Sequence, residues 1–462
     1  MSKQNMIPTS SSICYLEGRP LLIVFLIAIG CQVMCGCSSS KRPEERTVET
    51  NEVAAETAQA NIEAAVEDVG ITNNAGRSAS PINEAIELSV EDLLSAQLSQ
   101  AELADGWVRL FDGQSLFGWF AFGDADWSVA DGVIRVSEGE RSYLCTSFQI
   151  SDFELELDFR SDATTNSGVF LRTEPEPQDV ATESLELNIA PPDNAFPTGS
   201  FVNRQKLSTE ELGDFDTDQW HTYRVRLEGS HVQVALDGRD IMDFEAESVS
   251  PRGYISLQHN SGRVEFKNIR MRPIHSEHLV MDSGWESSWI KSQTEGVDFQ
   301  VEADDKGIHL TGGLGQLESK NQYDDFFLNA SYSLARPDVN SGIFFRCIPG
   351  KMLDGYECQV NHAMVEGNPL QPADAGAGAI FRRVDARLVV GDGTKPTHIA
   401  ILASGPQIAT WVNGVQMVDF LDQRAPDENP RRGLRTQAGT IAIQAHDPTT
   451  DVVFYTVAVS SL

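Results

Sequence analysis

Two glutamates of this chain stand where they could do acid–base or sugar-binding chemistry. Glu186 and Glu357 each lie in a short segment in which apolar and polar residues alternate. Because side chains alternate across a strand, each glutamate shares a sheet face with the amide two residues further on, Asn188 or Gln359. A carboxylate beside an amide can bind neighbouring sugar hydroxyls, and it can also act as a general base.

A further set of polar residues belongs to a motif that the chain contains twice. The first copy runs Asn-Ser-Gly-Val-Phe-Leu-Arg from Asn166 to Arg172, and the second runs Asn-Ser-Gly-Ile-Phe-Phe-Arg from Asn340 to Arg346. Each arginine has the same strand parity as the asparagine that opens its motif. We therefore expect an arginine, a glutamate and amides on one sheet face in each copy. Such a set could bind a sugar, or it could form an ion pair on a solvated surface.

The second copy also suggests how its strands pair. Ten residues separate Cys347 from Cys358, which suits a hairpin that pairs the two cysteines directly. That register would set Arg346 opposite Gln359, with Glu357 one pair along on the same face. The two cysteines could then form a disulfide in an oxidising compartment or remain reduced core thiols.

Strands must position these residues, and the chain supplies the same set of strands twice. Residues 153–160 alternate between apolar and charged side chains, and turn pairs such as Asp237-Gly238 recur as Asn413-Gly414. Long helical periodicity is absent. We therefore predict an all-β protein with two antiparallel sandwiches or jelly rolls in tandem, over residues 98–274 and 284–462.

Composition restricts the partners of the chain. Its 462 residues carry a formal net charge of −33. A phosphate backbone requires a basic surface, so we expect no nucleic-acid partner. The same charge argues against adsorption onto anionic lipid. No cluster of histidines and carboxylates has the spacing of a metal site, and we expect neither a metal nor a cofactor.

The N-terminal region has the features of an export signal. Residues 21–29 form an apolar run that is too short to cross a bilayer but is typical of a secretory signal peptide. Cys37 follows a small residue, in a setting that resembles a bacterial lipobox; Cys31 is the alternative lipidation site, and plain secretion is the alternative fate. We assign residues 1–37 to the signal and residues 38–97 to an acidic tether without a core of its own.

Seven segments of the first copy together resemble the 3-keto-disaccharide hydrolase family. They are Leu98 to Trp107, Leu110 to Trp119, Trp127 to Ile134, Asp152 to Leu155, Asn166 to Arg172, Gly253 to His259 and Val264 to Arg270. The second copy resembles the family more loosely. The resemblance implies a concanavalin A-like jelly roll, a location outside the cytoplasm, and cleavage of glycosides that are oxidised at C3, either hydrolytically or by elimination followed by hydration.

Chemistry on such a substrate gives the polar residues possible roles. A keto group at C3 acidifies the C2 proton, so Glu186 or Glu357 could remove it as a base. Donors on the same face could hold the developing enolate: Arg172, Asn188 and Asn166 in the first copy, and Arg346, Gln359 and Asn340 in the second. His259 and His446, near the ends of matching strands, are candidate acids for the leaving group.

A function of another class fits the same residues. Two weak sugar-binding sites on one chain gain avidity by being linked, so the chain could be a tandem carbohydrate-binding protein of the cell surface without catalysis. In either case we expect a carbohydrate partner, and contact with a membrane only through an N-terminal lipid. We expect an enzyme that cleaves 3-keto-glycosides in the cell envelope.

Overall fold

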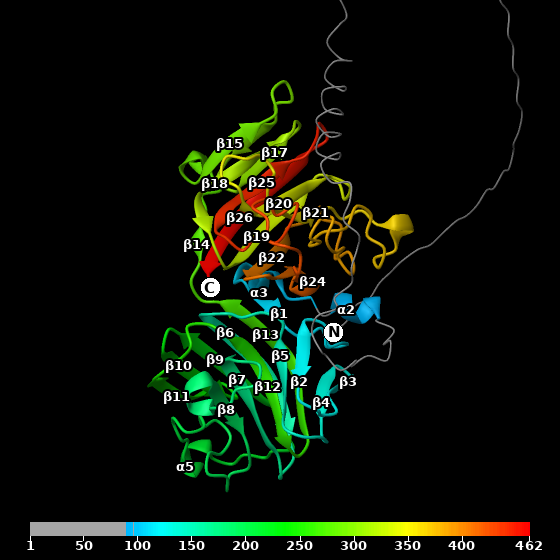
Figure 1. Cartoon of the computed structure of the whole chain (residues 1–462). Coiled ribbons are helices and arrows are strands. Elements are labelled where there is room, and N and C mark those ends of the chain that lie inside the picture. The colour runs from blue at the N-terminus through cyan, green and yellow to red at the C-terminus, as the bar shows by residue number, and fades with distance from the viewer. Residues whose placement is uncertain (1–88, 96) are drawn as a thin grey trace, which may run out of the picture. The chain divides into compact units, whose positions relative to one another are not determined.

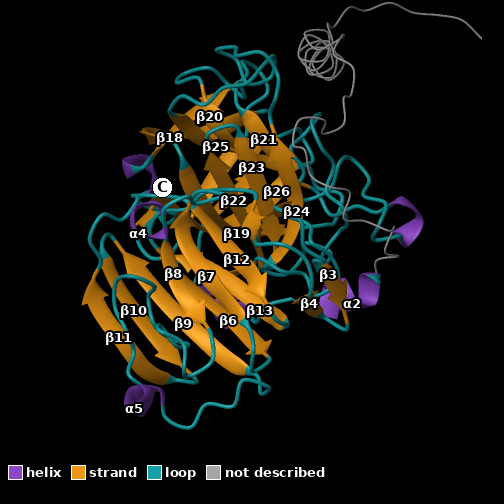
Figure 2. Cartoon of the chain, turned by 60° about the horizontal axis from the view of Figure 1, so that its bottom comes forward, coloured by secondary structure: helices purple, strands orange, loops and turns teal. Residues whose placement is uncertain are grey.

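The computed structural model describes residues 89–95 and 97–462 of the chain. Strands dominate this part, and the helices are short (Figures 1 and 2). The helical segments are α2 (Val90–Ser95), α3 (Gln100–Ala104), α4 (Val180–Glu183), α5 (Thr209–Leu212), η1 (Trp285–Ser287) and η2 (Val365–Gly367). None of these helices is long and apolar enough to cross a bilayer. The predicted signal peptide, Cys37 and most of the predicted tether lie outside the described residues.

The first sandwich consists of two antiparallel sheets. The larger has the order β11-β10-β9-β6-β13-β4-β3, with β1 paired to β13, and the smaller has the order β2-β5-β12-β7-β8. The strands of the larger sheet are β1 (Val108–Arg109), β3 (Ser128–Ala130), β4 (Val133–Val136), β6 (Phe153–Ser161), β9 (His221–Glu228), β10 (His231–Leu236), β11 (Arg239–Glu245) and β13 (Val264–Pro273). Those of the smaller are β2 (Trp119–Phe122), β5 (Ser142–Thr146), β7 (Asn166–Thr173), β8 (Leu185–Ile189) and β12 (Tyr254–Ser261).

The second sandwich repeats this arrangement. Its larger sheet has the order β16-β17-β26-β19-β22-β23-β24, with β14 paired to β26, and its smaller sheet has the order β15-β18-β25-β20-β21. The strands of the larger sheet are β14 (Glu277–His278), β16 (Gln300–Ala303), β17 (Ile308–Thr311), β19 (Phe326–Leu334), β22 (Thr397–Ser404), β23 (Gln407–Val412), β24 (Val415–Leu421) and β26 (Asp451–Ser461). Those of the smaller are β15 (Trp289–Gln293), β18 (Gly315–Tyr323), β20 (Ser341–Cys347), β21 (Tyr356–Val360) and β25 (Gly439–Ala445).

The two sandwiches therefore share one topology, strand for strand. The core of each lies between its two sheets, and strand β6 shows how the sequence builds it. Phe153, Leu155, Leu157 and Phe159 are fully buried, as the period of two in the sequence requires. The predicted fold class, two jelly-roll sandwiches in tandem, is confirmed.

The outer faces of the two larger sheets differ, and the difference shows how the copies contact each other. Glu154 on the first sheet pairs with Arg226 at 2.8 Å and Arg272 at 3.0 Å. On the second sheet, Phe327 and Trp411 belong instead to the apolar cluster of the first sandwich. The Trp411 indole nitrogen donates to a backbone carbonyl of strand β1 at 2.8 Å. The second sheet has apolar side chains where the first has paired charges, and this apolar face is buried against the first copy.

The predicted pairing of Cys347 with Cys358 is wrong. Cys358 lies opposite Ile343, and Cys347 lies opposite Thr440 on the neighbouring strand. The register of β20 shifts between Phe344 and Cys347, which adds one residue to that strand as a β-bulge. Both cysteines are buried free thiols.

Candidate functional site

In the first sandwich, one face of the smaller sheet gathers polar side chains. Pairing across this sheet aligns Tyr143 with Gln258, Gln258 with Gly168, and Gly168 with Asn188. Glu186 lies in the adjacent row, opposite Phe170. We call the side chains of Tyr143, Phe170, Glu186, Asn188 and Gln258 the Glu186 face. The predicted shared face of Glu186 and Asn188 is part of it.

Glu186 is a buried carboxylate without a cationic partner among the described residues. Only 6% of its surface is exposed. Burial raises the pKa of Glu186 to about 7, and the nearby Arg141 guanidinium lowers it only in part. A carboxyl group with a pKa near neutrality can both take up and release a proton at physiological pH, which is the property of a general base or acid.

The repeated Asn-Ser-Gly motif creates the space in which this glutamate lies. Ser167 donates to the backbone carbonyl of Gln258 at 2.7 Å and so fixes the two strands to each other. A Cβ atom on Gly168 would lie 3.1 Å from the Glu186 Cγ atom and 3.3 Å from its Oε1 atom. A larger residue at this position would press on the glutamate side chain, which lies across the glycine backbone.

Several polar atoms of the Glu186 face have no hydrogen-bond partner of ordinary geometry among the described residues. They are the Tyr143 hydroxyl, the Asn188 Oδ1 atom and the Gln258 Oε1 atom. The Tyr143 hydroxyl nevertheless lies close enough to the Gln258 side chain for this contact to lower the Tyr143 pKa in part. The Asn188 amide nitrogen donates to the Phe196 carbonyl, which fixes the orientation of its oxygen. Buried polar groups normally find partners, so these three atoms are placed to bind a polar ligand.

Tyr143 was not found from the sequence. All five residues of its strand β5 are buried, so no alternation of polarity shows which face each side chain takes. Its ring packs edge-on against Phe170, with centroids 5.2 Å apart. Burial raises the pKa of Tyr143, and the Glu186 carboxylate adds to the effect, so the phenol stays protonated and able to donate.

The second sandwich has a matching face with different electrostatics. Phe344 pairs with Glu357, and Gly342 pairs with Gln359. We call the side chains of Phe344, Glu357, Gln359 and Gln444 the Glu357 face. Here too a Cβ atom on the motif glycine, Gly342, would lie 3.2 Å from the glutamate Cγ atom. Gln316 occupies the position of Tyr143 in the first sandwich.

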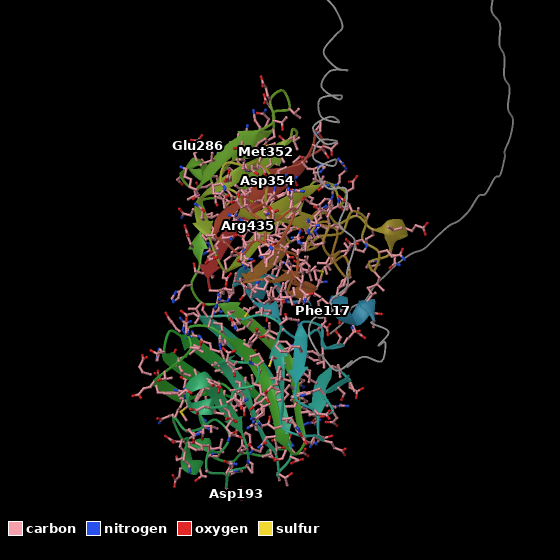
Figure 3. All side chains as sticks on the ribbon, viewed as in Figure 1. Phe117, Asp193, Glu286, Met352, Asp354 and Arg435 are labelled. Carbon is pink, nitrogen blue, oxygen red and sulfur yellow. The ribbon has the colours of Figure 1, made fainter. Side chains whose placement is uncertain are left out.

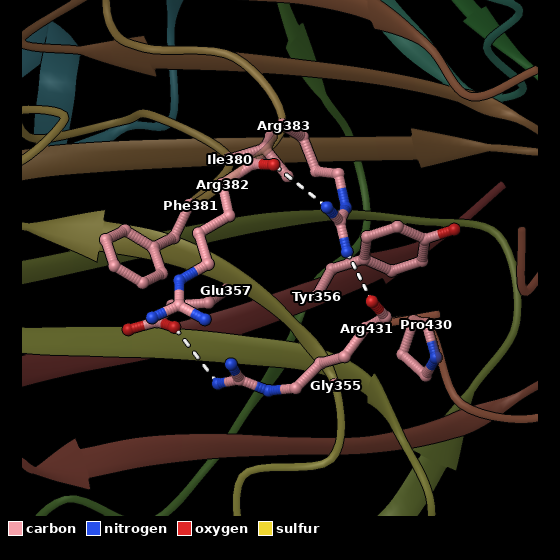
Figure 4. Close-up of a pocket in the computed structure, with 9 residues that line it drawn as sticks. All are labelled: Gly355, Tyr356, Glu357, Ile380, Phe381, Arg382, Arg383, Pro430 and Arg431. Atoms are coloured by element: carbon pink, nitrogen blue, oxygen red, sulfur yellow. Dashed lines mark hydrogen bonds and ion pairs between the residues drawn. The ribbon is translucent and has the colours of Figure 1, made fainter. Parts of the chain in front are cut away.

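Glu357 is held by an ion pair, unlike Glu186. Arg431 Nη2 donates to its Oε2 atom at 3.1 Å. Burial still raises the pKa of Glu357, although Arg431 and His446 oppose the rise. Figure 4 shows the ion pair of Arg431 with Glu357 in a pocket that Arg382 also lines. A paired carboxylate is a poorer base than an unpaired one, because proton uptake breaks the pair.

A loop also covers part of the Glu357 face. The connection between β20 and β21 carries Met352 and Leu353, which pack with Phe344 (Figure 3 labels Met352). The first sandwich has the longer helical connection with α4 at this point, and its Val180 packs near Phe170. The Glu186 face and the Glu357 face therefore differ in the connection that packs over them as well as in charge.

The family of the chain can be assigned at this point. The sequence profile of the 3-keto-alpha-glucoside-1,2-lyase-like domain matches residues 106–272 and again residues 281–459. The chain belongs to this family. It contains two copies of the domain, and the family predicted from the sequence is confirmed.

Individual relatives of the lyase-like domain are more distant. A 3-keto-disaccharide hydrolase of Bacteroides thetaiotaomicron is 28% identical over 103 residues, which cover 19% of this chain and 36% of that protein. The alignment thus spans about a third of that relative's length. A Parabacteroides distasonis structure described as a candidate glycosyl hydrolase is 21% identical, with a TM-score of 0.34, over 39% of this chain and 99% of that one. The carbohydrate-binding module CBM66 of Bacillus subtilis is 17% identical, with a TM-score of 0.26, over 34% and 95%.

Of the two predicted histidines, only His446 lies near one of the two faces that carry a glutamate, namely the Glu357 face. His446 follows Gln444 by two positions, and its Nε2 atom lies 3.4 Å from the Asn340 amide nitrogen. Burial would lower the pKa of His446, but the contact of its Nδ1 atom with Asp447 at 2.9 Å outweighs burial and raises it. His259 alternates with Gln258 and takes the opposite face of the sheet from Glu186, so it is not available there as an acid.

The two predicted arginines do not join the glutamates. Arg172 and Arg346 occupy the β-bulges of their strands with φ of 48° and 49°, which turns their side chains away from the predicted face. Arg172 pairs with Asp152 at 2.5 Å, and Arg346 pairs with Asp325 at 2.7 Å. Both also donate to backbone carbonyls of neighbouring connections. The two arginines therefore stabilise the fold. The prediction from strand parity was wrong because each arginine lies in a β-bulge.

The two predicted asparagines also differ. Asn340 donates to Asp374 at 2.8 Å, and Gln359 donates to the same carboxylate at 3.0 Å, so both belong to one network. Asn166 makes no comparable side-chain bond within the described residues. In that part of the chain, no group of three or more histidines, cysteines and acidic residues is arranged to hold a metal ion.

Proposed function

We propose that this chain cleaves 3-keto-glycosides outside the cytoplasm and that the Glu186 face of the first sandwich is the reacting site. The observation that carries the proposal is Glu186 itself, a buried, unpaired carboxylate with a pKa of about 7 among polar atoms that lack partners. Membership of the 3-keto-alpha-glucoside-1,2-lyase-like family supports the choice of substrate class.

The proposed reaction begins with proton transfer to Glu186. The carboxylate takes the C2 proton, and the C2–H electron pair forms an enolate with the C3 carbonyl. Collapse of the enolate forms the C1–C2 double bond, breaks the C1–O bond and expels the aglycone, which takes up a proton. Addition of water, with hydroxyl to C1 and a proton to C2, then gives the free 3-keto sugar. Hydrolysis is the sum of the two steps.

Tyr143 is the group best placed to stabilise the enolate. Its hydroxyl is protonated and buried, its side-chain contact is with Gln258, and it lies close enough to Glu186 for the carboxylate to raise its pKa. A buried donor aimed at developing negative charge is worth much more than one in water.

Tyr143→Phe is therefore expected to lower kcat about 10²-fold while KM changes little. Steady-state kinetics on a 3-keto-glucoside would measure both constants. Tyr323→Phe, which removes a hydroxyl from the second sandwich where it contacts Glu277, is the matched control and should leave turnover unchanged. Equal losses in the two variants would contradict the role of Tyr143.

Export and anchoring form part of the proposal, since the apolar run and Cys37 favour a lipoprotein. Expression in a bacterial host with a labelled fatty acid would test this part. We expect label on the wild-type chain and none on Cys37→Ala. Loss of label on Cys31→Ala instead would move the site to Cys31, and an unlabelled wild-type chain in the medium would indicate plain secretion.

The experiment that tests the activity is incubation of the purified chain with 3-keto-trehalose or a 3-keto-glucoside, with products followed by NMR. A 3-keto sugar, or a 2-hydroxy-glucal with the C1–C2 double bond, supports the proposal. Absence of both products, together with measurable glycan binding, supports a tandem carbohydrate-binding protein. The Arg431–Glu357 ion pair favours that second function for the second sandwich.

A further inference from the structure

The second sandwich carries a pocket whose charge is opposite to that of the chain as a whole. Glu357, Phe381, Arg382, Arg383 and Arg431 line it (Figure 4). Three arginines thus share the pocket with one carboxylate, although the chain has 68 acidic residues against 35 lysines and arginines. A local excess of positive charge in so acidic a chain is not a consequence of composition.

Two of these three guanidinium groups have no carboxylate partner among the described residues. Arg431 is paired with Glu357. Arg383 donates to the backbone carbonyls of Arg382 and Arg431, and burial, together with repulsion from Arg424, lowers the pKa of Arg383 to about 10. Arg382 is exposed at the mouth of the pocket. An anion in this pocket would meet charge that the protein leaves uncompensated.

Aromatic rings hold two of the arginines in place. The Arg382 guanidinium lies 5.3 Å from the centre of the Phe381 ring, and that of Arg431 lies 5.4 Å from the centre of the Phe344 ring. Stacking on a ring orders the planar guanidinium. The edge of Arg431 donates to the Leu353 carbonyl and to Glu357. Arg382 is therefore the stacked arginine available to donate two parallel hydrogen bonds to a ligand. Carboxylate and sulfate groups accept such paired bonds.

The other end of the Glu357 face is suited to hydroxyl groups. The Oε1 atoms of Gln359 and Gln444 are buried and have no partner among the described residues. Gln359 follows Glu357 by two residues on β21, a separation of about 7 Å along a strand. The amides therefore adjoin Glu357, which also lines the arginine pocket, so the hydroxyl-accepting atoms and the cationic groups belong to one continuous face.

The first sandwich lacks this arrangement. Val202 N donates to the Glu186 carbonyl as Phe381 N donates to that of Glu357, so Val202 and the following Asn203 occupy the places of Phe381 and Arg382. Arg431 comes from the connection over 422–438, which is longer than the corresponding connection over 246–253. The cationic pocket is a property of the second copy alone.

We propose that this pocket binds the anionic group of an acidic sugar, either the carboxylate of a uronate or a sulfate ester, while Gln359 and Gln444 accept hydrogen bonds from its hydroxyls. The second sandwich is then a binding module for acidic glycans on the same chain as the proposed reacting site of the first sandwich. This inference goes beyond the proposed cleavage and does not depend on it.

Titration of the purified chain by calorimetry with D-glucuronate, D-glucose 6-sulfate, D-glucose and inorganic sulfate tests the inference. We expect at least one of the acidic sugars to bind about tenfold more tightly than both glucose and inorganic sulfate, because charged hydrogen bonds and hydroxyl contacts then act together. The tighter of the two acidic sugars identifies the source of the anion. Affinity no greater than that for glucose, or equal binding of inorganic sulfate, would overturn the proposal.

Two variants with the same change of charge locate the site. Arg382→Gln is expected to weaken acidic-sugar binding about tenfold, and Arg382→Lys, which keeps the charge but loses the paired donors, by less. Arg432→Gln removes an exposed arginine outside the pocket and should have no effect. Equal behaviour of Arg382→Gln and Arg432→Gln would place the anion elsewhere. Glu186→Gln should keep acidic-sugar binding, because Glu186 lies in the other sandwich. The binding proposal and the cleavage proposal can therefore fail independently of each other.

Discussion

Replacement of Glu186 by glutamine is expected to reduce turnover of a 3-keto-glycoside by orders of magnitude and, at the same time, to stabilise the fold above neutral pH. The amide keeps the shape of the side chain but cannot take the C2 proton, so we expect kcat to fall by about 10²- to 10⁴-fold. In the wild-type chain, kcat/KM should rise with pH through the Glu186 pKa of about 7, because the base must be ionised. Steady-state kinetics with the substrate concentration varied at each pH between 5 and 9 would measure both effects.

The stability effect follows from the same pKa. The pKa of a glutamate in the unfolded chain is 4.5, and the pKa of Glu186 in the folded chain is about 7, so the folded state holds this proton more tightly. Glu186 therefore costs stability as pH rises from about 4.5 to about 7, and the loss then stays constant, at about 3 kcal/mol. Glu186→Gln lacks this titration. Its free energy of unfolding, relative to wild type, should rise between pH 5 and pH 8 by up to that amount.

Urea unfolding at pH 5 and pH 8 would measure the change in relative stability. Glu154→Gln is the matched control, because Glu154 is paired with arginines on a face that bears no proposed site. It should leave turnover unchanged and should not gain stability at pH 8. A Glu186→Gln chain that still turns over substrate would move the base to Glu357. Equal relative stability at the two pH values would mean that Glu186 is not the buried, raised-pKa group described.

The residues of the two faces show what a single sequence can and cannot predict. Glu186 with Asn188, and Glu357 with Gln359, were placed correctly because strand alternation is local and each pair lies on one regular strand. Arg172 and Arg346 were misplaced because each occupies a β-bulge, which inserts one residue and reverses parity. A bulge at arginine, with positive φ, has no sequence signal of the kind that glycine would give.

Other residues of the faces could not be found because their placement depends on the tertiary fold. Tyr143 lies on a strand that is buried on both sides, so polarity does not identify its face. Arg431 lies in a long connection between β24 and β25, and the sequence does not show where such a connection returns to the sheet. The family resemblance supplied the topology but did not show how the two copies differ in charge.

Replacement of Arg346 by methionine is expected to destabilise the chain strongly without a specific effect on sugar binding. The Arg346 side chain has no solvent exposure, and its guanidinium pairs with Asp325 at 2.7 Å and donates to the Gly405 carbonyl at 2.6 Å. The change leaves the Gly405 and Arg435 carbonyls without this donor and leaves Asp325 with Arg252 as its remaining arginine partner, which together costs on the order of 3 kcal/mol. Urea unfolding at pH 7 would measure the loss.

The equivalent arginine of the first sandwich provides an internal comparison. Arg172 pairs with Asp152, whose side chain is 32% exposed, whereas the Asp325 side chain is 11% exposed. Water can solvate Asp152 once its partner is gone, so Arg172→Met should cost less than Arg346→Met. Arg336→Met, at an exposed pair with Asp338, is the control and should change stability by at most about 0.5 kcal/mol. Normal stability of Arg346→Met with lost glycan affinity would instead return Arg346 to the sugar-binding role predicted from the sequence.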